Sequence, residues 1–308
     1  MTVKKPFQKF IRGGVYWVDE TNAALVPPAY ANFESVDSID KYENHTNMLL
    51  VRSGGIGDII ALSSLVGYAD QTIILTQSKY KPLGLYFDIP VSFRRFEEPL
   101  TMVSYNKTLQ SFIQRTGMMY GDTDIDNGSR DNWYEILSKS VGFEFDPEYG
   151  RPSLISLTNE VKDVCIVVSQ SSSVNRTASK SELDKLARKY FKNVIHADEQ
   201  GWTFSEYLHE LDKAKFVISV DTSAIHFREG IGKPALGLYG AFTTDSRTKY
   251  YKYTQSVNVK SSCEIQPCFY HDNQLCPKVT GNFAPCLSNN INDEQQNSDI
   301  ARILSEAL

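Results

Sequence analysis

Residues 48–60 read Met-Leu-Leu-Val-Arg-Ser-Gly-Gly-Ile-Gly-Asp-Ile-Ile, an apolar run that leads straight into a glycine-rich turn. The apolar run predicts a buried strand, and the residues from Ile59 to Tyr68 predict a helix. Between them, Gly54, Gly55 and Gly57 let the chain turn tightly and leave its backbone N–H groups bare. Such a turn at the start of a helix suits an anion such as a phosphate.

Asp58 falls in the first turn of this predicted helix. The helix dipole favours an ionised carboxylate there, and a carboxylate beside an anion-binding turn predicts a general base. A second interpretation needs no chemistry. In it, Gly54 and Gly55 form a plain strand-to-helix turn, and Asp58 only caps the helix.

The composition is that of an ordinary globular protein. The chain has 308 residues, of which 41% are hydrophobic and 22% charged, and this length predicts one large or two medium domains. A net charge of -5 argues against a general nucleic-acid binder. No stretch approaches about 18 consecutive apolar residues, and the N-terminus has no apolar signal segment. We therefore expect a cytoplasmic protein without a transmembrane segment.

Predicted strands and helices alternate along the chain, which is typical of parallel sheets covered by helices. In the first half, strands are predicted at 72–76 and 91–96, and helices at 109–113 and 133–137. Residues 142–152 are rich in proline and glycine and are predicted to link two domains.

The second half repeats the pattern. The predicted strands are 164–169, 193–197, 215–220 and 235–239, and the predicted helices are 181–190, 204–211 and 293–308. Two successive α/β halves imply a cleft between them, which is the usual place for a ligand.

The first residues do not follow this alternation. Residues 14–18 and 23–26 predict a β-hairpin. We therefore expect three parts: an N-terminal extension (1–45), a first Rossmann-like domain (46–150) and a second one (151–308).

Residues 217–226 read Val-Ile-Ser-Val-Asp-Thr-Ser-Ala-Ile-His, again a predicted strand that runs into a helix. Asp221, Thr222 and Ser223 stand at the turn and, with the bare N–H groups of the helix start, predict a second anion site. His226 is expected to face the same side as Thr222, because residues four apart share a helix face. The simpler alternative is a helix cap followed by a buried histidine that satisfies its own hydrogen bonds.

The two turns together resemble the paired signatures of the heptosyltransferase-like glycosyltransferases, glycosyltransferase family 9. Residues 232–240 and Thr243 are similar to that family's next strand and loop, and the resemblance covers roughly residues 48–250. It implies the GT-B fold, an α/β architecture of two Rossmann-like domains with parallel sheets that face a cleft. In that fold, the C-terminal domain holds the nucleotide-sugar donor.

The resemblance also implies roles for single residues. The family's first turn supplies the base that takes the proton of the acceptor hydroxyl, and Asp58 occupies that position. The second turn contacts the donor diphosphate, and here it holds Asp221, Thr222, Ser223 and His226.

Residues 169–180 are similar in place to the family's other donor-binding loop, in which Arg176 or Lys180 matches the basic residue. The family's proline-rich stretch is missing there. The expected reaction is an inverting transfer that requires no cofactor and no metal, because helix N-termini and a basic side chain stabilise the leaving group. The expected partners are a nucleotide-sugar donor and an acceptor that is a glycan, a lipid-linked glycan, a protein or a modified nucleic acid.

Two other functions fit parts of the sequence. One is a catalytically inactive relative that binds nucleotide-sugars or serves as an interaction protein, although Asp58 would then have no purpose. The other is an NAD(P)-dependent oxidoreductase, since Gly55 and Gly57 are similar to the start of a dinucleotide fingerprint. Ile60 breaks that fingerprint where a small residue is needed, and no acidic residue ends the next strand.

A cysteine-rich segment at 263–286 holds four thiols. Cys263, Cys268, Cys276 and Cys286 are close enough in sequence to form a tetrahedral structural zinc site. Their spacing is not a double Cys-x2-Cys, so free thiols or bridges are the alternative. Some members of family 9 also carry a cysteine-rich segment near the C-terminus.

Overall fold

The computed structural model describes most of the second half of the chain and a smaller part of the first. The described residues are 7–11, 14–18, 47–51, 55–66, 71–76, 78–87, 91–95, 130–140, 144–269, 275–279, 281–289 and 291–307. The helix predicted at 109–113 lies outside them. Among the helices that are described, none has the length and apolar character that a membrane span requires.

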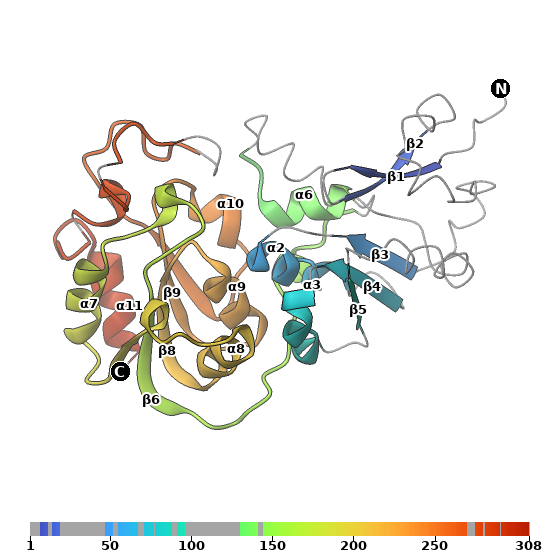
Figure 1. The fold of residues 1–308 in the computed structure, drawn as a ribbon. Coiled ribbons are helices and arrows are strands. Elements are labelled where there is room, and N and C mark those ends of the chain that lie inside the picture. Colours follow the sequence, from blue (N-terminus) through green and yellow to red (C-terminus); the bar gives the residue numbers. More distant parts are fainter. Residues whose placement is uncertain are drawn as a thin grey trace.

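A five-stranded parallel sheet forms the larger α/β unit (Figure 1). Its strands are β6 (Lys162–Val168), β7 (Val194–His196), β8 (Ala214–Val220), β9 (Ala235–Tyr239) and β10 (Thr254–Asn258), in the order β10-β9-β8-β6-β7. The α-helices of this unit are α7 (Lys180–Arg188), α8 (Phe204–Lys213), α9 (Ser223–Gly230), α10 (Thr244–Thr248) and α11 (Ser298–Glu306).

Helices cover both faces of this sheet, and successive side chains of β6 show why. Ile166 and Val168 belong to the buried cluster that includes α8 and α9. Cys165 and Val167 point the other way, into the cluster that includes α7 and α11. Because successive strand residues face opposite sides, a strand covered on both faces is apolar throughout. The continuous apolar runs of the sequence predict this arrangement correctly.

The smaller unit contains a three-stranded parallel sheet in the order β3-β4-β5. Its strands are β3 (Asn47–Val51), β4 (Gln71–Thr76) and β5 (Val91–Arg95), and its α-helices are α2 (Ile56–Ala61), α3 (Ser63–Val66) and α6 (Trp133–Ser140). Short 3-10 helices occur at η3 (Ser78–Tyr86), η4 (Pro147–Tyr149), η5 (Val174–Arg176), η6 (Ala197–Glu199) and η7 (Pro285–Leu287).

The N-terminal hairpin exists, but its strands differ from the prediction. β2 (Gly14–Val18) pairs antiparallel with β1 (Phe7–Ile11), which precedes it. The partner that we predicted, 23–26, lies outside the described residues. The signal in the sequence for this pairing is Gly13, a turn residue directly before β2.

Two helix boundaries also differ from the sequence prediction. The first helix starts at Ile56 and is interrupted at Leu62 before α3 begins. The last helix starts at Ser298 rather than at Asp293. The side chain of Asp293 accepts the backbone N–H groups of the next turn, so these residues form a turn instead of a helix.

The two units share a buried core where α2 packs against α9. Ile59 and Leu65 from the smaller unit belong to the same buried cluster as Ile225 and Phe227 from α9. Two parallel sheets thus meet through the helices that follow β3 and β8 (Figure 1). This is the arrangement that the GT-B expectation requires.

Candidate active site

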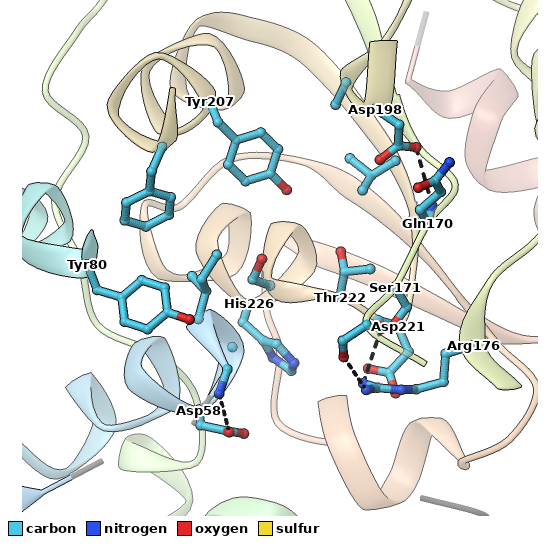
Figure 2. A pocket seen from close by; sticks show the side chains of 18 of the residues that line it. Asp58, Tyr80, Gln170, Ser171, Arg176, Asp198, Tyr207, Asp221, Thr222 and His226 are labelled. Carbon is cyan, nitrogen blue, oxygen red and sulfur yellow. Dashed lines mark hydrogen bonds and ion pairs between the residues drawn. The ribbon is translucent and has the colours of Figure 1, made fainter. Parts of the chain in front are cut away.

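A cavity of about 830 Å³ lies where α2 meets the ends of the larger sheet (Figure 2). Residues that follow β6, β7 and β8 form most of one wall, and the first turn of α2 forms part of the other. Ligands of parallel α/β sheets bind outside the carboxyl ends of the strands, so the cavity has the expected place.

Asp58 lines this cavity from the first turn of α2. Its Oδ2 atom accepts the backbone N–H of Gly55 at 3.1 Å, which satisfies one of the free donors at the helix start. The carboxylate is partly exposed and lies at the cavity wall (Figure 2). It therefore caps the helix and remains accessible to a ligand, so the two interpretations of this residue are compatible.

The predicted anion-binding glycines are described in part. Gly55 and Gly57 line the cavity, whereas Gly54 lies outside the described residues. A methyl group on Gly57 would lie 3.3 Å from Cδ2 of His226, closer than an ordinary contact. The structure thus gives Gly57 a packing role between two helices, and phosphate binding at this turn stays a prediction.

The turn after β8 brings the second predicted constellation to the cavity. Thr222 is the N-cap of α9, and its side chain accepts the N–H of Ala224 at 3.2 Å. Asp221 is buried, and its Oδ2 atom has no hydrogen bond among the described residues. Ser223 lines the cavity beside it. The start of α9 and the Asp221 carboxylate, which lies 3.8 Å from Arg176, thus form one polar part of the cavity wall.

The two basic residues predicted for donor binding are placed differently. Arg176 lines the cavity, 3.8 Å from the carboxylate of Asp221, and it donates to the Ser172 hydroxyl at 3.2 Å. Lys180 does not line the cavity, because its exposed ammonium group pairs with Glu199. Of the two, Arg176 is therefore the one in position to contact a ligand there.

His226 is almost completely buried and lies between Asp58 and Asp221 (Figure 2). Burial lowers the pKa of its imidazole to about 4, so the ring is neutral at pH 7. The ring Nδ1 is hydrogen-bonded to the hydroxyl of Tyr251, which lies 2.5 Å from the hydroxyl of Tyr134. This chain of hydrogen bonds connects α9 of the larger unit to α6 of the smaller one.

Asp198 was not among the residues predicted from the sequence, although it lines the cavity. Its Oδ2 atom accepts the N–H and the hydroxyl of Ser169, at 3.0 and 2.9 Å, and the N–H of Gln170 at 3.3 Å. The carboxylate therefore fixes the loop after β6 in place. Its position at the end of β7 was the signal that could have identified it.

Further cavity residues come from elements far apart in the sequence. Aromatic side chains and one arginine line the cavity in addition to the predicted residues: Tyr80, Trp133, Trp202, Phe204, Tyr207 and Arg247. No short motif contains them, because folding alone brings them together.

The four C-terminal cysteines are free thiols in the structure. Burial, and then the charges of the other three, raise the pKa of Cys286 to about 12. Among the described residues, no three His, Cys, Asp or Glu side chains are close enough to hold a metal ion. The described thiols do not form a ligand set, so a metal here stays a prediction.

Comparison with known proteins supports the interpretation of the second turn. The family profile of glycosyltransferase family 9 (heptosyltransferase) matches residues 200–278, about a quarter of the chain. No curated protein matches the sequence.

Two solved structures of TibC share the fold at low sequence identity. The iron-containing dodecameric glycosyltransferase TibC from enterotoxigenic E. coli H10407 has a TM-score of 0.60 and 13% identity, over 97% of this chain and 84% of TibC. TibC in complex with ADP-D-beta-D-heptose gives a TM-score of 0.57 and 12% identity, with the same coverage. E. coli heptosyltransferase WaaC with ADP gives a TM-score of 0.49 and 12% identity, over 85% of this chain and 99% of WaaC.

The fold is therefore that of the GT-B glycosyltransferases. The resemblance to the heptosyltransferase-like members of family 9, drawn from the two turns, is confirmed.

Proposed function

We propose that this protein is a glycosyltransferase that moves a sugar from a nucleoside diphosphate donor to an acceptor hydroxyl, with inversion at the sugar carbon. One observation carries the proposal. The Asp58 carboxylate and the pair formed by Arg176 and the start of α9 line the same cavity from different units (Figure 2). An inverting transfer needs a base and an anion-binding surface on opposite sides of the reacting carbon.

The donor would lie along the ends of the strands of the larger sheet. Trp202 and Tyr207, beyond β7, supply aromatic surface of the kind that a nucleoside base packs against. The diphosphate would lie at the start of α9, where the helix dipole favours negative charge. Arg176 would donate to its oxygens.

The reaction would be a single displacement. Asp58 accepts the proton of the acceptor hydroxyl, the freed oxygen bonds to the sugar carbon, and the bond from that carbon to the diphosphate breaks. The nucleoside diphosphate leaves with the bonding electron pair, and its growing charge is stabilised by the α9 N-terminus and Arg176. We propose that these groups take the place of a divalent metal at the diphosphate.

We propose the following division of labour. Residues 46–150 bind the acceptor and carry the base, and residues 151–308 bind the donor. The cysteine-rich segment 263–286 would be structural. The acceptor is a glycan, a lipid-linked glycan, a protein or a modified nucleic acid, and the protein acts in the cytoplasm.

A thermal-shift screen of the full chain tests the donor site. The probes are nucleoside diphosphates, nucleotide-sugars and NAD(P), with ADP-heptose as the first sugar donor because TibC is known in complex with it. A ligand that binds the native state raises the melting temperature by mass action. We expect a shift with one nucleoside diphosphate and its sugar, and a smaller shift in Arg176→Gln.

A shift with NAD(P) alone would contradict the proposal and favour an oxidoreductase. A shift with a nucleotide-sugar but no turnover with any acceptor hydroxyl compound would favour the inactive binding protein. Lys180→Gln is the matched control for Arg176→Gln, because Lys180 pairs with Glu199 outside the cavity.

A further inference from the structure

Arg247 lines the cavity and is held by aromatic rings alone. Its guanidinium carbon lies 4.3 Å from the ring centroid of Phe242 and 5.3 Å from that of Trp133. Among the described residues it makes no hydrogen bond and no ion pair. The rings orient the guanidinium without neutralising it, so its five N–H donors remain available.

Three other described cations of the larger unit are compensated. Arg176 faces Asp221 at 3.8 Å, and Lys180 pairs with Glu199. Arg228, which is completely buried, donates to backbone carbonyls. Arg247 has neither a carboxylate nor a carbonyl of the protein as its partner. A guanidinium in this position is well suited to bind a carboxylate or a phosphate of a ligand.

The order of the strands locates Arg247 relative to the donor. Along the sheet edge, Asp198 follows β7, Arg176 follows β6, Asp221 follows β8 and Arg247 follows β9. In the proposed function the nucleoside lies beyond β7 and the diphosphate beyond β6 and β8. The next position along the sheet edge, beyond β9, is then that of the transferred sugar and the acceptor. Trp133, which touches Arg247, belongs to the smaller unit, the one that carries Asp58.

We propose that Arg247 is a binding residue for an oxyanion on the acceptor, either a carboxylate or a phosphate carried by a sugar. This inference rests on the proposed glycosyltransferase function and narrows its acceptor to an anionic glycan. Trp133 and Phe242 act as the support that keeps the guanidinium in the cavity, near the hydroxyl that Asp58 would deprotonate.

The test compares charged and neutral sugars on the full chain, first saturated with the nucleoside diphosphate that the donor screen identifies. The probes are glucose 6-phosphate, glucuronate and glucose, and the readout is the thermal shift at constant ionic strength. We expect at least one charged sugar to bind about tenfold or more tightly than glucose. Arg247→Gln should abolish this difference, and Arg247→Lys should retain part of it.

Arg130→Gln is the matched control. Arg130 also lies over an aromatic ring, 5.0 Å from the centroid of Phe269, but it does not line the cavity. This variant should keep the preference for the charged sugar. The melting temperature of each variant without ligand shows whether it is folded. If Arg247→Gln does not fold, Arg247→Lys takes its place in the comparison.

Three results would overturn the inference. Arg247 binds no anionic group of the acceptor if neither charged sugar binds more tightly than glucose. The same conclusion follows if Arg247→Gln leaves the preference for the charged sugar intact. If Arg247→Gln instead weakens the binding of the nucleoside diphosphate as much as Arg176→Gln does, Arg247 binds the donor. Failure of the parent function is separate, because the wild-type chain would then bind no nucleoside diphosphate at all.

Discussion

Gly57 faces the ring of His226 where α2 packs against α9, the contact that joins the two units of the protein. A methyl group at position 57 would lie 3.3 Å from Cδ2 of His226 and 3.7 Å from Cα of Ser223. The distance between α2 and α9 therefore depends on the absence of a side chain at position 57.

We expect Gly57→Ala to lower turnover more than stability. The added methyl pushes α2 and α9 apart by a few tenths of an ångström, and a small misplacement of reacting groups costs about tenfold or more in rate. Steady-state kinetics and the melting temperature measure the two effects. Gly55→Ala is the control, because its methyl would meet Asp58 at an ordinary 3.7 Å. Equal turnover in both variants would show that the contact is unimportant.

Tyr251 should position His226. The Tyr251 hydroxyl is hydrogen-bonded to Nδ1, and when the hydroxyl is the donor the single proton of the neutral ring lies on Nε2. In Tyr251→Phe the ring loses this partner, and we expect kcat to fall about tenfold while KM for the donor changes little. The Tyr134 hydroxyl is hydrogen-bonded to Tyr251 and not directly to His226, so Tyr134→Phe should lower kcat by a smaller factor.

The neighbouring tyrosine provides the control for that variant. The Tyr250 hydroxyl donates to Glu135 on α6, so it also ties the two units together but does not touch His226. Tyr250→Phe should therefore keep its kcat. A loss equal to that of Tyr251→Phe would indicate that only the link between the units matters.

The buried His226 predicts a pH dependence of stability. Its folded pKa of about 4 lies below the ordinary 6.5, so protons bind the unfolded chain more readily. The free energy of unfolding should thus be unaffected by this group above pH 6.5 and fall as the pH decreases toward 4. The loss is at most about 3 kcal/mol. Urea unfolding of the wild type and His226→Gln at pH 7 and pH 5 measures it, and identical pH dependence in both would contradict this assignment.

The cysteine-rich segment predicts a bound metal in protein purified from metal-supplemented cells. If the four thiols bind zinc, elemental analysis should find about one ion per chain, and Cys286→Ser should remove it. Cys165→Ala should not, because Cys165 is buried in β6, away from the segment. If the elemental analysis finds no metal in the wild-type protein, the four cysteines are free thiols and the zinc prediction is wrong.

The sequence predicts the parallel strands of the larger unit well, because a strand that is buried on both faces must be apolar throughout. β10 escaped prediction for the opposite reason. It is an edge strand that carries mostly polar residues, Thr254 to Asn258, and its partner β9 supplies the pairing. Edge strands of this kind take their structure from a neighbour rather than from their own pattern.

The same distinction applies to the site. Asp58 and the turn from Asp221 to His226 could be predicted, because each belongs to a contiguous motif at a strand-to-helix junction. Trp202 and Arg247 could not, since each reaches the cavity from an element whose local pattern carries no sign of it. Gly57 was recognised, but its packing against α9 depends on a residue far along the chain.

The central claim is that Asp58 is the base of a sugar transfer, and Asp58→Asn tests it most directly. The amide keeps the size of the carboxylate but cannot take a proton, so kcat should fall by about 10²–10⁴-fold. The thermal shift with the nucleoside diphosphate should remain, because we propose that the donor binds to the larger unit. Turnover within a few-fold of the wild type, with the donor still bound, would contradict the account.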